Sequence, residues 1–382
     1  MLRFPDVNSD LTAWLQVGWS EDQFREFKSA LPGKESSAKT DFLKDVSAFA
    51  NAQGGEIIYG VREDAGRADG FVDLGEQDWD KVELRLRQWL ADLDPPIGGV
   101  RMSPRGTAAG KLFLVEVPES PTAPHRTPDA ASGAYWGRDG NRQRILRTAE
   151  LVVLLRGRED RARRFQEHRR ERVLVARSGD GVPAVGMQGL LFRISPERPL
   201  DIDPHAQRYR DRLRPPIVVD SGYSYPSCPD GRLAVSAPSA GYALLTHDGE
   251  VEVAVPLRVL DGSGGQTTVA LGQALSPIVE GLESWTQLLA DDRDAQATVA
   301  LDVWGLLGHR AQLPSGSAFD FLPMQRHFVR DTFESLPESA AVGALPAVRF
   351  ALRRIVGRLW QAAGWADGCP YLDERGEWVR GR

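Results

Sequence analysis

Glu26 and Lys28 form a pair of side chains that could carry out phosphoryl chemistry. They are two residues apart in a segment that predicts a β-strand, so both point to the same face of that strand. A carboxylate there could bind a hard cation such as Mg²⁺ or Mn²⁺, and the ammonium could stabilise charge that develops on a phosphate. Taken alone, such a pair is more typical of a simple surface ion pair.

Further acidic residues flank this pair along the chain. Glu21 precedes Glu26, and Glu63 with Asp64 follows the end of the next predicted strand. Carboxylates that converge from several segments can hold a divalent cation, which activates water and neutralises phosphoryl charge. Alternatively, these acids lie only at a helix end, on a solvated strand face and in a polar turn. Spacing alone leaves both interpretations open.

A strand, a helix and a second strand must position these side chains. Residues 24–31 predict the first strand, and residues 37–53 predict a helix with one apolar face. The helix should stop at Gly54-Gly55, because glycine readily adopts the left-handed conformation that ends helices. Residues 57–61 then predict a mostly apolar strand.

The predicted elements extend this α/β arrangement to about residue 155. Pro95-Pro96 should end a second helix. The remaining elements are a short opening helix at 11–15, the second helix at 78–93, strands at 112–117, 134–138 and 143–147, and a helix over 148–155.

Three regions are predicted overall: an α/β domain with a mixed sheet flanked by helices at 1–155, an arginine-rich helical connector at 156–177, and an α+β domain at 178–382. The connector holds nine arginines with acids among them at helical spacing. That pattern suits a solvated or domain-bridging helix as well as one that contacts RNA. The C-terminal region should contain strands at 189–194, 217–220 and 233–236, a hairpin at 242–255, and a helix near 348–359.

Composition excludes several classes of protein. The 382 residues include 42% hydrophobic residues, which favours a folded globular chain, and the net charge of −6 argues against general coating of nucleic acid. No membrane span or secretory signal is recognisable, so a cytoplasmic protein is expected. The two cysteines are far apart in the sequence and lack the spacing of zinc ligands, which argues against a structural zinc site.

A longer motif surrounds the acidic residues. The sequence Ala48-Phe49-Ala50-Asn51 leads through two glycines into a strand that ends Gly60-Val61-Arg62-Glu63, and a later segment reads Tyr135-Trp136-Gly137-Arg138-Asp139-Gly140. In this order and spacing the chain resembles the Schlafen family, over about residues 15–155. The resemblance implies a Schlafen AlbA-like domain at the N-terminus and says little about the remainder.

The resemblance also implies a set of site residues. In Schlafen nucleases two glutamates and an acidic residue after Gly-Val form the catalytic triad, which by motif position are Glu21, Glu26 and Glu63 here. The third position is usually Asp, so Glu63 is longer by one methylene and Asp64 is a possible substitute. The implied activity is a metal-dependent endoribonuclease that uses Mg²⁺ or Mn²⁺, with Lys28 stabilising developing charge.

Structured RNA, and tRNA in particular, is the substrate class that the resemblance implies. A role in phage defence or stress response would follow by analogy, with a homodimer or a second lobe in 178–382 completing the RNA-binding surface. Arg138 and Lys28 could contact phosphate, and Tyr135 could stack on an exposed base. Trp136 is better explained by core packing, and His125 by a structural hydrogen bond.

Two other functions stay open. The same domain could belong to a non-catalytic nucleic-acid-binding transcriptional regulator, since it also resembles DNA-binding AlbA-like modules. An ATP-binding protein is the weaker alternative, because the segment around Lys34 lacks the complete phosphate-binding loop motif. Asp201, Asp203 and His205 resemble a small metal cluster, although a polar loop explains them better.

Overall fold

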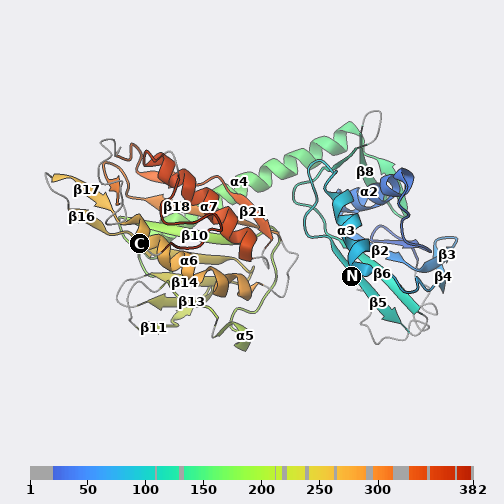
Figure 1. Cartoon of the computed structure of the whole chain (residues 1–382), viewed down its shortest axis with the longest axis horizontal. Coiled ribbons are helices and arrows are strands. Elements are labelled where there is room, and N and C mark those ends of the chain that lie inside the picture. Colours follow the sequence, from blue (N-terminus) through green and yellow to red (C-terminus); the bar gives the residue numbers. More distant parts are fainter. Residues whose placement is uncertain are drawn as a thin grey trace. The chain divides into compact units, whose positions relative to one another are not determined.

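The computed structural model confirms an α+β protein and divides the chain into two compact units, Met1–Arg164 and Phe165–Arg382 (Figure 1). It describes residues 20–107, 110–128, 133–210, 212–216, 222–236, 241–261, 265–289, 296–312, 327–341, 345–365 and 368–379. The predicted helix at 11–15 and the predicted strand at 217–220 lie outside these ranges. No helix in the described ranges is both long and apolar enough to cross a membrane.

The N-terminal unit is built on a four-stranded mixed sheet. In spatial order its strands are β1 (Arg25–Lys28), β2 (Gly55–Tyr59), β6 (Gly110–Val117) and β5 (Arg101–Thr107). β1 runs parallel to β2, whereas the other neighbours are antiparallel. The strand with the predicted Glu26 and Lys28 pair is therefore an edge strand of this sheet.

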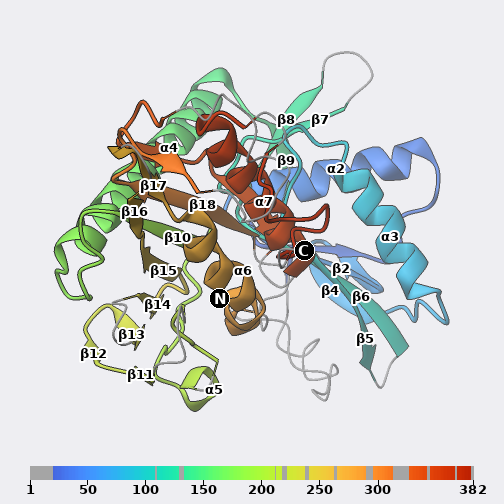
Figure 2. The same ribbon diagram turned by 60° about the vertical axis from the view of Figure 1, so that its left-hand side comes forward.

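Two helices cover one face of the sheet, as predicted (Figure 2). They are α2 (Ser36–Ala50) and α3 (Trp79–Leu90). Their apolar side chains, such as Phe49 and Leu86, pack with Ile57 and Phe113 from the strands into one core. Glu26 and Lys28 lie on the α2 side of β1, because the intervening Phe27 packs into the core on the opposite face.

The predicted strand at 57–61 is interrupted at Gly60. This glycine has a φ of 93°, a backbone conformation that other residues rarely adopt. The chain turns there into the hairpin of β3 (Val61–Asp64) and β4 (Arg67–Phe71). A second small sheet contains β7 (Arg126–Thr127), β8 (Ala134–Asp139) and β9 (Arg142–Ile145). β8 packs against α2.

The helix predicted over 148–155 is much longer. α4 extends over 31 residues, Thr148–Ser178, and includes the whole arginine-rich segment. Acids among the arginines allow ion pairs along the helix, as between Arg163 and Asp160, so nothing in the segment forces it to stop. The division between the two units falls within this helix.

The C-terminal unit contains a nine-stranded sheet. Its main path is β11 (Tyr223–Ser224), β13 (Gly231–Ser236), β14 (Tyr242–Thr246), β15 (Val251–Pro256), β10 (Gly189–Pro196), β18 (Gln296–Trp304) and β20 (Thr332–Glu334), with β12 (Ser227–Cys228) on β13 and β21 (Glu338–Ala341) on β18. The predicted hairpin is confirmed as β14 and β15. The other elements are a small sheet of β16 (Val259–Asp261), β17 (Thr267–Val269) and β19 (Arg310–Ala311), and the short helix α5 (Gln207–Arg210).

Helices pack on both faces of this sheet. α6 (Leu271–Leu288) and α7 (Leu345–Ala362) share a large apolar core with one face. On the other face the C-terminal part of α4 makes buried ion pairs. Arg169 Nε lies 2.9 Å from both carboxylate oxygens of Asp302, and Arg172 Nε lies 2.8 Å from Glu252 Oε2. Part of the arginine-rich segment is therefore interior rather than solvated.

Candidate functional site

Glu26 is held between two cations at the edge of the N-terminal sheet. Its Oε1 accepts a hydrogen bond from Lys28 Nζ at 2.9 Å, and its Oε2 accepts one from Arg138 Nη1 at 2.9 Å. The Glu26 side chain is only 11% exposed, so both interactions occur in a largely desolvated environment. The structure thus brings together three of the residues singled out from the sequence.

Asp45 of α2 completes this charged cluster, and sequence analysis missed it. Its Oδ2 lies 3.6 Å from Lys28 Nζ, and its Oδ1 accepts a hydrogen bond from the Gln143 side chain. Burial raises the pKa of Asp45 to about 7, despite the attraction of Lys28. A signal was available, since Asp45 is a charged residue beside Phe42 and Val46 on the buried stretch of the helix.

Glu21 lies within electrostatic reach of the other predicted acids. Its Oε1 accepts a hydrogen bond from the backbone N–H of Phe27 at 3.0 Å. Burial raises the pKa of Glu21, the Phe27 hydrogen bond opposes this rise, and the negative charges of Glu26 and Glu63 raise the pKa further. Such mutual repulsion requires the three carboxylates to share one region of the unit.

Glu63 and Asp64 occupy the exposed end of the β3–β4 hairpin. Glu63 Oε2 accepts a hydrogen bond from the backbone N–H of Gly66 at 2.6 Å, and the Gly66 carbonyl accepts one from the backbone N–H of Glu21 at 2.7 Å. The hairpin turn therefore connects the Glu21 segment to Glu63. A β-bulge between Arg62 and Glu63 changes the register at this point.

The donor atoms present here suit a hard cation, although they do not form a closed site. Within the described ranges, no three Asp, Glu, His or Cys side chains converge closely enough to hold a metal ion. Both oxygens of Glu26 already face cations, whereas Glu21 has one oxygen on a backbone N–H and Glu63 is exposed. Carboxylate oxygen is the ligand that Mg²⁺ and Mn²⁺ prefer, so the chemistry of these residues fits such an ion.

Arg138 faces the interior of the unit. Its side chain is 1% exposed, and besides Glu26 it contacts the Asp22 carbonyl oxygen through Nη2 at 3.0 Å. The guanidinium carbon also lies 4.2 Å from the centre of the Phe49 ring. These contacts show Arg138 joining β8 to the edge strand and to α2. Its predicted contact with RNA phosphate stays a prediction.

The aromatic residues before Arg138 lie on the same strand. Tyr135 and Trp136 are both half-buried. Trp136 donates a hydrogen bond from Nε1 to Thr127 Oγ1 at 3.2 Å, and Lys44 Nζ lies 5.0 Å from the centre of its ring. Trp136 is thus held by contacts within the N-terminal unit, and the stacking proposed for Tyr135 stays a prediction.

Asn51, the last residue of the Ala-Phe-Ala-Asn motif, fastens the end of α2 to two other segments. Its Nδ2 donates to the carbonyl oxygens of His125 at 3.1 Å and Trp136 at 2.8 Å, and its Oδ1 accepts from the His125 backbone N–H at 2.7 Å. His125 is fully buried, and burial lowers the pKa of its imidazole. Both residues therefore belong to the framework that supports the charged cluster.

The polar residues at 201–205 form a turn. The Asp203 carboxylate accepts a hydrogen bond from the backbone N–H of His205 at 3.0 Å, a local contact typical of loops. This contact agrees with the polar-loop interpretation of these residues.

The N-terminal unit thus combines a mixed sheet, flanked by helices, with a cluster of acids and cations at the edge of that sheet. Residues 21–147 match the family model described as Schlafen, AlbA_2, so this part of the chain is similar to Schlafen-type domains, which supports a nucleic-acid-related function. This confirms the predicted resemblance for the N-terminal unit.

Two solved structures match parts of the chain. The DIP2311 protein of Corynebacterium diphtheriae is 20% identical over 35% of this chain and 24% of its own length, with a TM-score of 0.26. The N-terminal domain of a protein described as RecG-related, from Nitrosomonas europaea, is 26% identical over 36% of this chain and 92% of its own, with a TM-score of 0.24. The matched part thus spans about a quarter of the first structure. No curated protein matches the chain.

Proposed function

We propose that the N-terminal unit is a metal-dependent endoribonuclease that cuts structured RNA, with tRNA as the substrate class implied by the Schlafen resemblance. The observation that carries the proposal is the position of Glu21 and Glu26 beside Lys28, with Glu63 near Glu21. Burial is the main cause of the raised pKa of Glu21, and the negative charges of Glu26 and Glu63 raise that pKa further, so the three acids lie close enough to repel one another. A bound metal ion would neutralise the repulsion between these carboxylates, and this accounts for their proximity.

Each residue has a distinct role in this proposal. Glu21, Glu26 and Glu63 would hold Mg²⁺ or Mn²⁺, with Asp64 able to substitute for Glu63. When bound, the ion would activate water and neutralise phosphoryl charge. Lys28 is 38% exposed, so its ammonium can reach a phosphate while Glu26 and Asp45 orient it. Its charge would then stabilise the transition state.

The proposal is tested by incubating the full chain with total tRNA in Mn²⁺ or Mg²⁺. Glu21→Gln, and Glu63→Gln combined with Asp64→Asn, should each lower the cleavage rate roughly 10²-fold or more, because each change removes negative charge from the proposed metal site. Glu83→Gln, on α3, provides a matched control that should cleave like the unmodified protein. Asp64→Asn, alone and with Glu63→Gln, shows which acid acts. Intact tRNA under every metal would refute the proposal.

The pairing of Glu26 favours a second candidate, a non-catalytic nucleic-acid-binding regulator. Both of its carboxylate oxygens are engaged by Lys28 and Arg138, as in a purely structural cluster. A regulator should bind RNA or DNA equally well in EDTA and in Mn²⁺, and Glu21→Gln should leave that affinity unchanged. Metal-stimulated binding that Glu21→Gln abolishes would argue against this candidate.

The remaining proposals concern the biological role, the localisation and the oligomeric state of the protein. We propose a role in phage defence or stress response, and a cytoplasmic homodimer in which residues 178–382 sense a trigger or make the dimer contact. Both ideas rest on the family resemblance. Sedimentation of the purified chain tests the dimer. The ATP-binding alternative predicts phosphate release from ATP that is lost in Lys34→Ala.

A further inference from the structure

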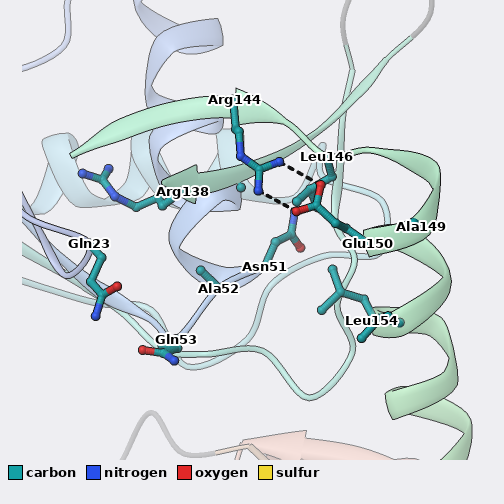
Figure 3. A pocket seen from close by; sticks show the side chains of 12 residues that line it. Gln23, Asn51, Ala52, Gln53, Arg138, Arg144, Leu146, Ala149, Glu150 and Leu154 are labelled. Carbon is teal, nitrogen blue, oxygen red and sulfur yellow. Dashed lines mark hydrogen bonds and ion pairs between the residues drawn. The ribbon is translucent and has the colours of Figure 1, made fainter. Parts of the chain in front are cut away.

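A pocket of about 470 Å³ lies beside Arg138 in the N-terminal unit (Figure 3). Its apolar lining comes from the segment after β9 and the first turns of α4, namely Leu146, Ala149, Val153 and Leu154. The volume falls within the range of sites that enclose small organic molecules, roughly 300–1,000 Å³. An apolar surface of this kind favours a ligand with a flat, uncharged body.

Two glutamine side chains also line this pocket, one from the segment before β1 and one from the turn after α2. They belong to Gln23 and Gln53, and Figure 3 shows both across the pocket from Leu154. Both residues are exposed, and Figure 3 draws no hydrogen bond from either amide to another residue of the pocket. A glutamine amide offers a donor and an acceptor side by side, which matches the edge of a nucleobase.

The cations in the wall of the pocket are already neutralised. Arg144 makes two parallel contacts with Glu150, Nη1 to Oε2 at 2.8 Å and Nη2 to Oε1 at 2.5 Å, and Arg138 is paired with Glu26. The lining therefore offers no unpaired cation to a phosphate or triphosphate. An uncharged aromatic ligand fits these walls better than a nucleotide bound through its phosphates.

Arg138 connects this pocket to the charged cluster, because it both lines the pocket and binds Glu26. We propose that the pocket receives one unpaired, extruded nucleobase of the RNA, which places the adjoining phosphate near Lys28. This inference rests on the proposed function and narrows its substrate class to RNA with an unstacked base, as in a loop or bulge. Such bases are the usual targets of protein recognition in RNA.

Val153→Trp tests the proposal by filling the pocket with an indole ring. Val153 is 68% exposed at the surface of α4, so the larger side chain should be tolerated by the fold. Val152→Trp is the matched control, because Val152 is 40% exposed on the same helix and does not line the pocket. Circular dichroism verifies that both variants fold. Gln53→Ala is a second variant that removes an amide without adding bulk.

The probe is an RNA hairpin with one loop adenine replaced by 2-aminopurine, whose fluorescence rises when the base leaves its stack. All variants carry Glu21→Gln, so that the readout does not depend on cleavage. We expect a fluorescence rise on binding, an affinity roughly tenfold lower with Val153→Trp, and no change with Val152→Trp. Gln53→Ala should give a smaller loss.

The possible results distinguish a failure of the base-pocket proposal from a failure of the nuclease proposal. Hairpin binding that is identical in Val153→Trp, without any fluorescence rise, would overturn the base pocket and leave the proposed function intact. Adenosine provides the second measurement, by NMR titration of the full chain. If tRNA is never cut but adenosine shifts resonances of pocket residues, and Val153→Trp abolishes those shifts, the pocket is supported and the nuclease is not.

Discussion

Lys28 owes its properties to the carboxylates around it. Burial by itself would lower the pKa of this lysine, but Asp45, Glu26 and Glu21 outweigh burial and raise the pKa above its ordinary value. The ammonium therefore stays charged throughout the pH range in which RNA is stable. A lysine that is always protonated and partly exposed can stabilise the negative charge that develops on a phosphate during cleavage.

Asp45 should make the stability of the N-terminal unit depend on pH. Burial raises its pKa to about 7, so between about pH 4 and pH 7 the folded state holds a proton that the unfolded chain has lost. Stability from this group therefore falls as the pH rises through that window. We expect Asp45→Asn to raise the free energy of unfolding by about 1–3 kcal/mol at pH 8 and to change it little at pH 4.

Urea denaturation at the two pH values measures this difference. Asp41→Asn is the matched control on the same helix, because the Asp41 side chain is 74% exposed. Its effect should be small and similar at both pH values. An Asp45→Asn effect that is equal at pH 4 and pH 8 would show that Asp45 is already charged in the folded state at low pH.

At the scale of the elements, Asn51 determines how α2 is attached to its neighbours. Replacing it with alanine removes two buried hydrogen bonds to His125 and a partly buried one to Trp136, and it leaves these backbone groups without their Asn51 partner. We expect Asn51→Ala to destabilise the N-terminal unit by about 2–4 kcal/mol, as measured by denaturation. Asn141→Ala, in an exposed turn, is the control and should change little. A similar small effect for Asn51→Ala would contradict this bracing role.

The sequence predicted a helix or strand well where residues close to it in the chain determine its position. The end of α2 is one case, although the helix stops at Ala50, three residues before the predicted end: Gly54 has a φ of 75° in the turn that follows, and a Cβ on Gly55 would lie 2.3 Å from the Phe49 ring. Apolar periodicity likewise predicted α2, α3 and α7. Periodicity could not reveal where α4 ends, because an arginine-rich helix has no apolar stripe whose loss marks its terminus.

The candidate site depended on contacts that the sequence does not display. Arg138 binds Glu26 across 112 positions of the chain, so its burial could not be read from neighbouring residues. The sequence shows Asp45 as a charged residue on an apolar helix face. Its ion pair with Lys28 depends on the packing of β1 beside α2, which the sequence does not show. Long-range pairing of charges is therefore the part that required the structure.

At the scale of the whole molecule, each unit has a hydrophobic core of its own. The N-terminal core lies between α2, α3 and the four-stranded sheet, and the C-terminal core lies between α6, α7 and the nine-stranded sheet. Apolar cores of separate units allow separate cooperative transitions. A substitution inside one core should consequently be visible in one transition only.

Arg169 offers the sharpest test, because its removal leaves Asp302 buried without its principal partner. The Arg169 side chain is 2% exposed and also donates to the Ser335 carbonyl oxygen at 2.7 Å. Breaking a buried ion pair costs about 3–5 kcal/mol, which corresponds to roughly 6–20 °C in the melting temperature of a unit of this size. Differential scanning calorimetry of Arg169→Ala should therefore show one transition lowered by that amount and the other unchanged. Arg170→Ala, the exposed neighbour on α4, should shift neither, whereas Asn51→Ala should lower the opposite transition. Equal shifts of both transitions in Arg169→Ala would show that the two units unfold as one.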